Sequence, residues 1–113
     1  MRVYNEHSGN EYTCWFESVP GVPTVPTTVH WRLRNVSADQ ILQDWTELTP
    51  EIVSDESGIT GVKTTIDING QLNVLFSRSA RRETFELQVV ADKDDPREYS
   101  KFHQYAVANG GQR

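Results

Sequence analysis

The chain has 113 residues, of which 36% are hydrophobic and 10% aromatic, and it carries a formal net charge of −5. This length suits one domain with a core of its own, and the aromatic content argues against disorder throughout. An acidic chain is a poor candidate for nonspecific DNA binding, which needs a basic surface. We therefore expect a single folded domain without direct contact to nucleic acid.

A single cysteine, Cys14, excludes an intrachain disulfide. A free thiol is typical of proteins that fold in a reducing cytoplasm. The first residues, MRVYNEHSGNEY, lack the apolar run of a signal peptide. No stretch has the ~20 apolar residues that a membrane helix needs. The sequence therefore predicts a protein made in the cytoplasm, with no membrane contact.

The first part of the chain predicts an arm, a strand and a connector. Residues 1–10 are polar, and HSGN at 7–10 predicts a loose N-terminal arm or a turn. Residues 11–19 (EYTCWFESV) alternate imperfectly, which favours an edge strand. The PGVPTVP stretch that follows is rich in proline, which lacks the N–H that a sheet ladder needs. We expect it to be an extended connector.

Two strictly alternating stretches, residues 27–35 (TTVHWRLRN) and 82–91 (RETFELQVVA), predict the central strands. A period of two places one set of side chains on a buried face and the other set on a wet face. The side chains of these strands expected in the core are Trp31, Leu33, Phe85, Leu87 and Val89. The other large aromatic residues expected to fill it are Trp15, Phe16, Trp45, Phe76 and Phe102.

Residues 40–48 (QILQDWTEL) fit two structures. Ile41, Leu42, Trp45 and Leu48 would share one helical face, but a strand with a bulge accommodates them equally well. The short turn before this segment is compatible with a hairpin. We favour a strand, because its neighbours are strand-like and a lone helix would need another layer to pack on.

The second half of the chain continues the β pattern. Residues 49–61 predict a long polar connection, and residues 62–68 alternate cleanly. Asn69 and Gly70 suit a type I′ turn into a short strand at 72–76. The remaining segments are a basic loop (77–82, SRSARR), an acidic turn (92–96), a last strand (98–108) and a disordered tail (109–113). About seven strands at this spacing predict an all-β, immunoglobulin-like antiparallel β-sandwich over residues 11–108.

The sequence offers little for catalysis. A nucleophilic site needs a serine or cysteine beside a histidine, and the available residues are Cys14, His7, His30 and His103. No G-x-S-x-G motif is present, and nothing has zinc-ligand spacing. The run DKDD at 92–95 could offer oxygens to calcium but lacks the spacing of an EF-hand loop, so an acidic turn is the better interpretation. We expect no enzyme activity, no catalytic residue, no metal and no cofactor.

Charge is unevenly distributed. Residues 1–56 carry nine acids and three bases, which gives −6, and residues 57–113 carry seven acids and eight bases, which gives +1. Arg78, Arg81 and Arg82 lie in one loop with no acid among them. Guanidinium groups pair bidentately with carboxylates, so these arginines are candidate partner-binding residues. A loop that only aids solubility is the alternative.

Three stretches carry a resemblance to a known family. They are residues 25–35 (VPTTVHWRLRN), 41–50 (ILQDWTELTP) and 82–91 (RETFELQVVA). In this pattern the sequence resembles small, single-domain immunoglobulin-like structural proteins of tailed bacteriophages. The likeness extends over roughly residues 11–105.

The resemblance implies a non-catalytic virion protein, made in the host cytoplasm and present in several copies per particle. Such a protein would decorate or cement the capsid, or belong to the head–tail junction or tail, by binding major capsid, portal or tail proteins. The alternative is a carbohydrate-binding or adhesion module. A sugar platform needs a row of exposed aromatic residues, whereas here we expect most aromatic residues in the core.

Overall fold

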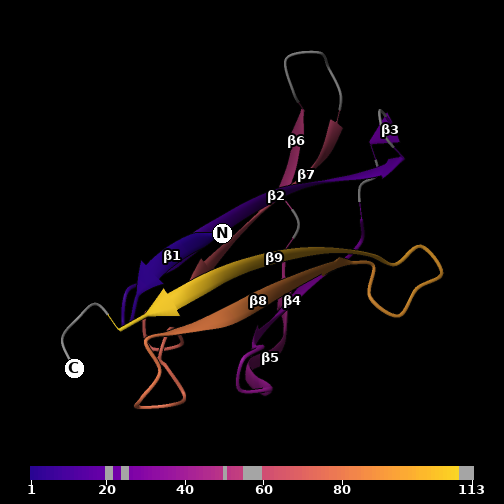
Figure 1. The fold of residues 1–113 in the computed structure, drawn as a ribbon. Helices are drawn as coiled ribbons and strands as arrows, with labels where there is room; N and C mark the ends of the chain where they lie inside the picture. The colour runs from indigo at the N-terminus through magenta and orange to yellow at the C-terminus, as the bar shows by residue number, and fades with distance from the viewer. Residues whose placement is uncertain (20–21, 24–25, 50, 55–59, 110–113) are drawn as a thin grey trace.

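The computed structural model describes residues 1–19, 22–23, 26–49, 51–54 and 60–109. These residues form an all-β structure in which no helix occurs (Figure 1). The strands are β1 (Arg2–Asn5), β2 (Asn10–Val19), β3 (Val22–Pro23), β4 (Val29–Asn35), β5 (Gln40–Leu48), β6 (Glu51–Ser54), β7 (Thr60–Ile68), β8 (Arg82–Ala91) and β9 (Tyr99–Ala108).

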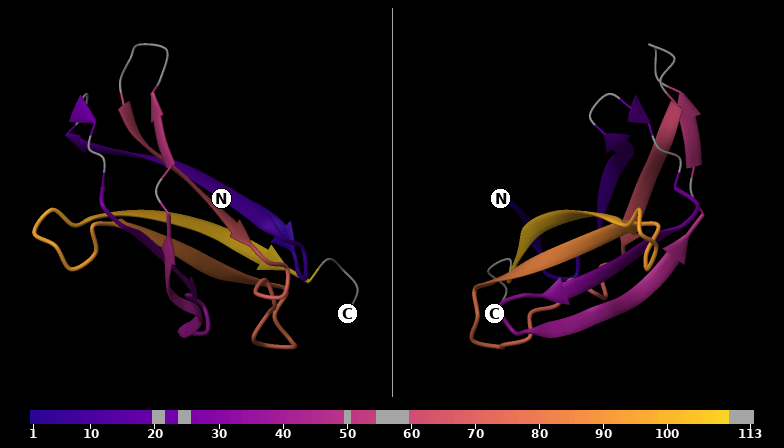
Figure 2. Two further views of the ribbon diagram at one scale, coloured as in Figure 1. Left: turned by 180° about the vertical axis from the view of Figure 1, so that it is seen from behind. Right: turned by 90° about the vertical axis from the view of Figure 1, so that its right-hand side faces the viewer.

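The strands form two sheets. The large sheet has the order β1-β9-β8-β4-β5, and the small sheet has the order β3-β2-β7-β6. The view from behind and the side view in Figure 2 show β2 and β7 lying across one face of β9, β8 and β4. Strand β1 pairs with β9 in parallel, and every other described pair is antiparallel. The large sheet is therefore mixed, whereas the sequence predicts a purely antiparallel one.

Strands β4 and β8 lie side by side at the centre of the large sheet, as the alternation predicts. Their register runs from Val29 opposite Ala91 to Asn35 opposite Phe85. Every second residue of β4 is fully or almost fully buried, and its alternate residues are half-buried. The side chains expected in the core of these strands are all buried, which confirms that part of the prediction: Trp31, Leu33, Phe85, Leu87 and Val89.

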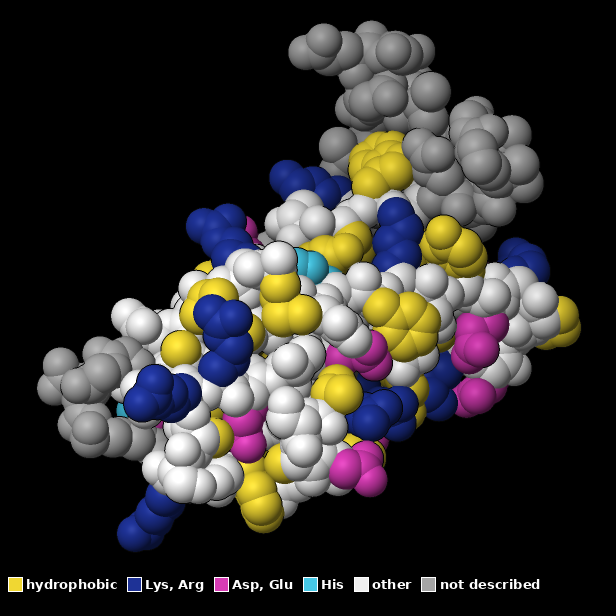
Figure 3. All heavy atoms as spheres, viewed as in Figure 1, with side chains coloured by type: hydrophobic (Ala, Val, Ile, Leu, Met, Phe, Trp, Pro, Cys, Tyr) yellow, Lys and Arg dark blue, Asp and Glu magenta, His cyan; other side chains and the backbone are white. Residues whose placement is uncertain are grey.

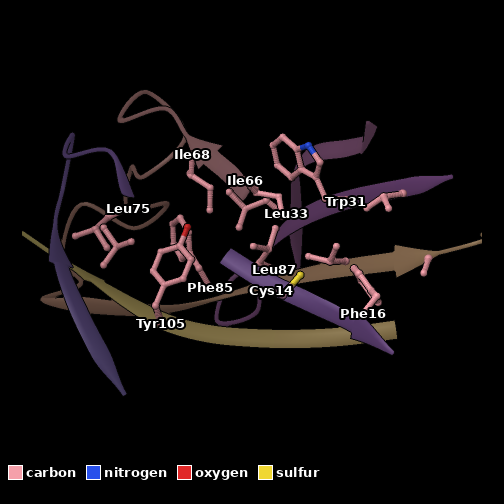
Figure 4. Packing of buried hydrophobic residues seen from close by; sticks show 14 residues of the cluster. Cys14, Phe16, Trp31, Leu33, Ile66, Ile68, Leu75, Phe85, Leu87 and Tyr105 are labelled. Carbon is pink, nitrogen blue, oxygen red and sulfur yellow. The ribbon is translucent and has the colours of Figure 1, made fainter. Parts of the chain in front are cut away.

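The core lies between the two sheets. Figure 4 shows side chains of β2 and β7 from one sheet and of β4, β8 and β9 from the other pointing toward one another. Cys14 and Phe16 enter it from β2, and Ile66 and Ile68 enter it from β7. Burial of this apolar surface is the main source of stability, at roughly 25 cal/mol per Å².

Strand β5 confirms the strand alternative for residues 40–48, including the bulge. Trp31 of β4 faces Thr46, but Leu33 faces Gln43, so β5 has one residue more than β4 over this interval. The register shifts again between Leu33 and Arg34. Thr46 faces the buried Trp31, so the adjacent residue along β5, Trp45, points to the outer face, where Arg32 lies over its ring, instead of into the core.

The expectation of a loose arm at residues 1–10 is wrong for Arg2–Asn5, which form β1. Arg2 pairs with Tyr105 and Asn5 with Ala108. Tyr4 packs edge to face on Tyr105, with ring centroids 5.5 Å apart. Only Tyr4 of this strand is partly buried, so a four-residue edge strand leaves no alternation that the sequence could reveal.

The turn expected at Asn69 and Gly70 differs in the structure. The amides of Gln71 and Leu72 bond back to Asn69, through its side-chain Oδ1 at 2.9 Å and its carbonyl at 2.9 Å, and no strand forms at 72–76. Gly70 is needed for close approach rather than for positive φ, because a Cβ there would collide with the carbonyl group of His7. This segment packs on the chain between β1 and β2, which is a long-range contact.

Part of the segment expected to be a polar connection, residues 49–61, is a strand. β6 pairs antiparallel with β7, with Glu51 opposite Lys63 and Ser54 opposite Thr60. Residues 55–59 of the expected connection and residues 110–113 of the expected tail lie outside the described part of the chain. Asn109, the first residue of that tail, donates its amide to the carbonyl of Arg81 at 3.1 Å.

Candidate functional site

The loop that carries the candidate arginines has a defined conformation. We call residues 77–82 the arginine loop. Ala80 donates its amide to the Ser77 carbonyl at 3.2 Å, and the hydroxyls of Ser77 and Ser79 lie 3.0 Å apart. Arg78, Arg81 and Arg82 are all exposed. The three predicted residues thus lie in the loop that leads into β8 and at the first residue of that strand (Figure 1).

A buried carboxylate anchors this loop. Glu83 is only 6% exposed, and its Oε1 accepts hydrogen bonds from the Phe76 amide at 2.5 Å and from Asn35 Nδ2 at 3.2 Å. Both ends of the arginine loop are therefore held, one by β8 itself and the other through Phe76. Reading the sequence does not reveal Glu83 as an anchor, because an acid beside three arginines resembles a surface residue.

Phe76 does not lie in the core as expected. Its side chain is 61% exposed, beside the arginine loop. The turn between β4 and β5 reaches the same end of the domain, because Val36 donates its amide to the Thr84 carbonyl at 2.8 Å. Val36 is also exposed. This end of the domain therefore presents apolar side chains together with arginines, a mixture that suits contact with a protein.

Two carboxylates face each other on the outer side of the small sheet. Glu11 of β2 pairs in register with Asp67 of β7, and both are exposed. The next outward pair is Thr13 and Thr65, whose hydroxyls lie 3.1 Å apart. Like charges directly opposite on neighbouring strands are destabilising. Within the described residues, no ion pair neutralises either carboxylate.

The outer face of the large sheet carries a connected row of side chains. The Arg32 guanidinium carbon lies 4.6 Å from the ring centre of Trp45, and its NH2 donates to Gln88 Oε1 at 3.1 Å. Lys93 lies on the same Trp45 ring at 5.1 Å. Phe102, opposite Gln88 on β9, is 58% exposed. Phe102 and Trp45 thus depart from the expected core positions.

Exposed hydrophobic side chains of the described residues do not merge into one patch on the face that Figure 3 displays. Yellow side chains there are interspersed with basic, acidic and neutral polar ones. Singly scattered hydrophobic residues are normal on protein surfaces. Specific contacts on this face would depend on charged and aromatic residues rather than on broad apolar burial.

The residues considered for nucleophilic chemistry occupy different parts of the fold. Cys14 is buried in the core, and burial raises the pKa of its thiol to about 11, partly offset by Lys101. His103 packs on Tyr12 with ring centres 4.5 Å apart, and burial lowers its pKa. His30 lies on the other face of the large sheet, and His7 lies in the turn after β1. A thiol with a raised pKa is a poor nucleophile at neutral pH.

The acidic turn after β8 is held together by its own contacts. Asp92 is buried, and its Oδ1 accepts the amide of Thr27 at 2.8 Å. Asp95 pairs with Arg97 at 3.2 Å, and hydrogen bonds from the backbone and side chain of Arg97 lower the pKa of the Asp95 carboxyl. Among the described residues, no group of three or more histidine, cysteine or acidic side chains could hold a metal ion, and no helix could span a membrane.

Comparison with known protein families, with curated proteins and with solved structures finds no match to this chain.

Proposed function

We propose that the chain is a non-catalytic structural protein of a tailed bacteriophage, with an immunoglobulin-like fold that binds other virion proteins. Its sequence supports this through the three stretches that resemble the phage proteins, which form β4, β5 and β8. These strands are neighbours in the large sheet, so the resemblance falls on one structural unit.

The strand order is the structural observation that supports the immunoglobulin-like fold in this proposal. In immunoglobulin domains of the variable type, strands G, F, C and C′ form one sheet, and strands B, E and D form the other. The chain has β9-β8-β4-β5 and β2-β7-β6 in the corresponding order. Under this assignment Trp31 lies on strand C and Cys14 on strand B, as in disulfide-bonded domains. Leu87 and its buried neighbours on β8 contribute apolar packing where the partner cysteine of such domains would lie.

The surfaces on this scaffold support a role in binding proteins. The end of the domain that carries the arginine loop presents Phe76 and three arginines, and the buried Glu83 holds this loop through the Phe76 amide. Arginine and aromatic residues are enriched at the centres of protein interfaces. The partners that this proposal names are major capsid, portal or tail proteins, with several copies of the chain in each particle.

The experiment is to purify particles of the phage that encodes the chain on a density gradient and to quantify the protein by mass spectrometry. We expect a constant number of copies per particle, comparable to other structural proteins. Recovery of the protein only in the soluble fraction of the lysate would contradict a virion role. Genes for capsid, portal and terminase proteins beside its own gene would be consistent with the expected result.

A carbohydrate-binding or adhesion module is a second candidate, and the exposed Phe102 favours it. An aromatic ring beside the amide of Gln88 and the hydroxyl of Ser100 offers the stacking and hydrogen bonding that sugars use. A glycan array with the wild-type protein and Phe102→Ala tests this alternative. Binding that disappears in the variant would favour it over the virion role, and no binding to any glycan would count against it.

A further inference from the structure

Two surfaces of the chain are complementary in charge. The arginine loop carries three exposed guanidinium groups and no acid. The outer face of the small sheet carries Glu11 and Asp67 directly opposite each other. Planar guanidinium groups bind carboxylates bidentately and are weakly hydrated, so they are well suited to such a pair at an interface.

No ion pair within the described part of the chain joins these two surfaces to each other. Among the described residues, neither Arg81 nor Arg82 takes part in an ion pair. The carboxylate pair of Glu11 and Asp67 likewise has no cation partner among these residues. A like-charge pair on adjacent strands costs stability in the isolated domain, and a cation from another molecule would remove that cost.

Both surfaces lie toward the same end of the domain. Asn73, in the connection that leads to the arginine loop, donates from Nδ2 to Asn10 Oδ1 at 2.7 Å. Asn10 is the residue before Glu11 and pairs with Ile68, the residue after Asp67. Two complementary surfaces at one end of a domain can meet reciprocally across a two-fold axis, which is the commonest symmetry of protein dimers.

We propose that two copies of the chain form a symmetric dimer in which the arginine loop of each copy docks on the Glu11–Asp67 pair of the other. The exposed Phe76 beside each loop adds an apolar contact. Such a contact is required because charged pairs at the rim of an interface contribute little to binding affinity by themselves. The inference rests on the proposed function, since it names a second copy as one of the virion partners. It is nevertheless tested on the purified full chain, independently of incorporation into particles.

The experiment compares self-association by sedimentation velocity at about 10 mM and about 1 M salt, where the Debye length falls from about 30 Å to about 3 Å. We expect the wild type to dimerise with rising protein concentration at low salt and to dissociate at high salt. A wild-type protein that stays monomeric at millimolar concentration in low salt would overturn the proposal. So would a dimer that is indifferent to salt.

Charge reversal identifies the contact. Arg81→Glu with Arg82→Glu in one variant, and Glu11→Arg with Asp67→Arg in another, should each weaken dimerisation by at least about tenfold, which corresponds to 1.4 kcal/mol. Mixing the two variants should restore association, because each loop then meets an oppositely charged pair in the other copy. Mixed variants that stay monomeric while both retain wild-type circular dichroism would overturn the proposed contact.

Two further variants control for unrelated effects. Lys93→Glu with Arg97→Glu makes the same change in net charge in the turn between β8 and β9, and we expect it to dimerise like the wild type. Phe76→Ser should weaken the dimer without loss of folding, because the side chain is largely exposed. If the Lys93 and Arg97 variant weakens dimerisation as much as the loop variant does, net charge rather than the proposed contact is responsible.

Discussion

Replacing Asn73 with leucine tests the buried polar cluster that joins the connection after β7 to the start of the chain. The Asn73 side chain is 0% exposed. Its Nδ2 donates to the Ser8 carbonyl and to Asn10 Oδ1, both at 2.7 Å, and its Oδ1 accepts from the Tyr105 hydroxyl at 2.8 Å. Asn73→Leu keeps the number and branching of the side-chain heavy atoms and removes all three hydrogen bonds, so no large cavity accompanies the loss.

The expected cost follows from the surroundings of each partner. The Tyr105 hydroxyl belongs to a fully buried residue and cannot turn to water, so leaving it unsatisfied costs about 1–3 kcal/mol. Ser8 is exposed and Asn10 half-buried, so each of those lost bonds costs about 0.5–1.5 kcal/mol. The free energy of unfolding should therefore fall by roughly 2–6 kcal/mol, a large part of the 5–15 kcal/mol typical of a domain.

Urea unfolding of the wild type, Asn73→Leu, Tyr105→Phe and the double variant measures this cost and its origin. Tyr105→Phe should cost about 1–3 kcal/mol, because it leaves Asn73 Oδ1 without its partner. In the double variant neither group is left unsatisfied at this contact, so its cost should be less than the sum of the single costs by about 0.5–3 kcal/mol. Additive costs, or a loss below about 0.5 kcal/mol for Asn73→Leu, would refute the reasoning.

The remaining predictions concern the core and the loop anchor. Trp31→Ala should lower the free energy of unfolding by about 3–5 kcal/mol as a large-to-small change in the core, and an unchanged urea midpoint would contradict its burial. Burial raises the pKa of the Cys14 thiol from 9.0 to about 11, so the thiol ionises at lower pH in the unfolded chain than in the folded one. The free energy of unfolding should therefore fall as the pH rises between these values, more steeply for the wild type than for Cys14→Ala. Identical pH profiles of the wild type and Cys14→Ala would contradict this. Cys14→Ser should leave the proposed incorporation into particles intact. Glu83→Ala leaves Asn35 Nδ2 and the Phe76 amide without their acceptor, so the free energy of unfolding should fall by about 2–6 kcal/mol. Hydrogen exchange at the Phe76 amide should become faster, and an unchanged exchange rate would exclude Glu83 as the anchor.

The alternation of apolar and polar residues was enough to define the strands whose side chains form most of the core. The alternation of β4 and β8 predicts both their conformation and their buried residues, because a half-buried strand must place every second side chain in the core. Strand β5 is assigned from its strand-like neighbours, whereas the period of two also locates β2, β7 and β9 to within a few residues. These strands are long, so the period of two extends over enough residues to be recognised.

The exposed aromatic residues depended on tertiary structure. Large aromatic side chains are expected inside, yet Phe76 follows a connection whose neighbours Asn73 and Leu75 take the buried positions. Trp45 points outward because its neighbour Thr46 faces the buried Trp31, and Arg32 and Lys93 lie over its ring. Composition cannot reveal either outcome, because the first depends on how the connection after β7 packs and the second on the register between β4 and β5.

The candidate site, too, was determined partly by the sequence and partly by the tertiary structure alone. The sequence by itself determined that three arginines share one acid-free loop, since they are adjacent along the chain. Only the tertiary structure decided that Glu83 holds this loop and that Glu11 faces Asp67, because those contacts join residues 7 and 56 positions apart. It also decided that residues 2–5 complete the large sheet, since a short edge strand is specified by the strand it pairs with rather than by its own side chains.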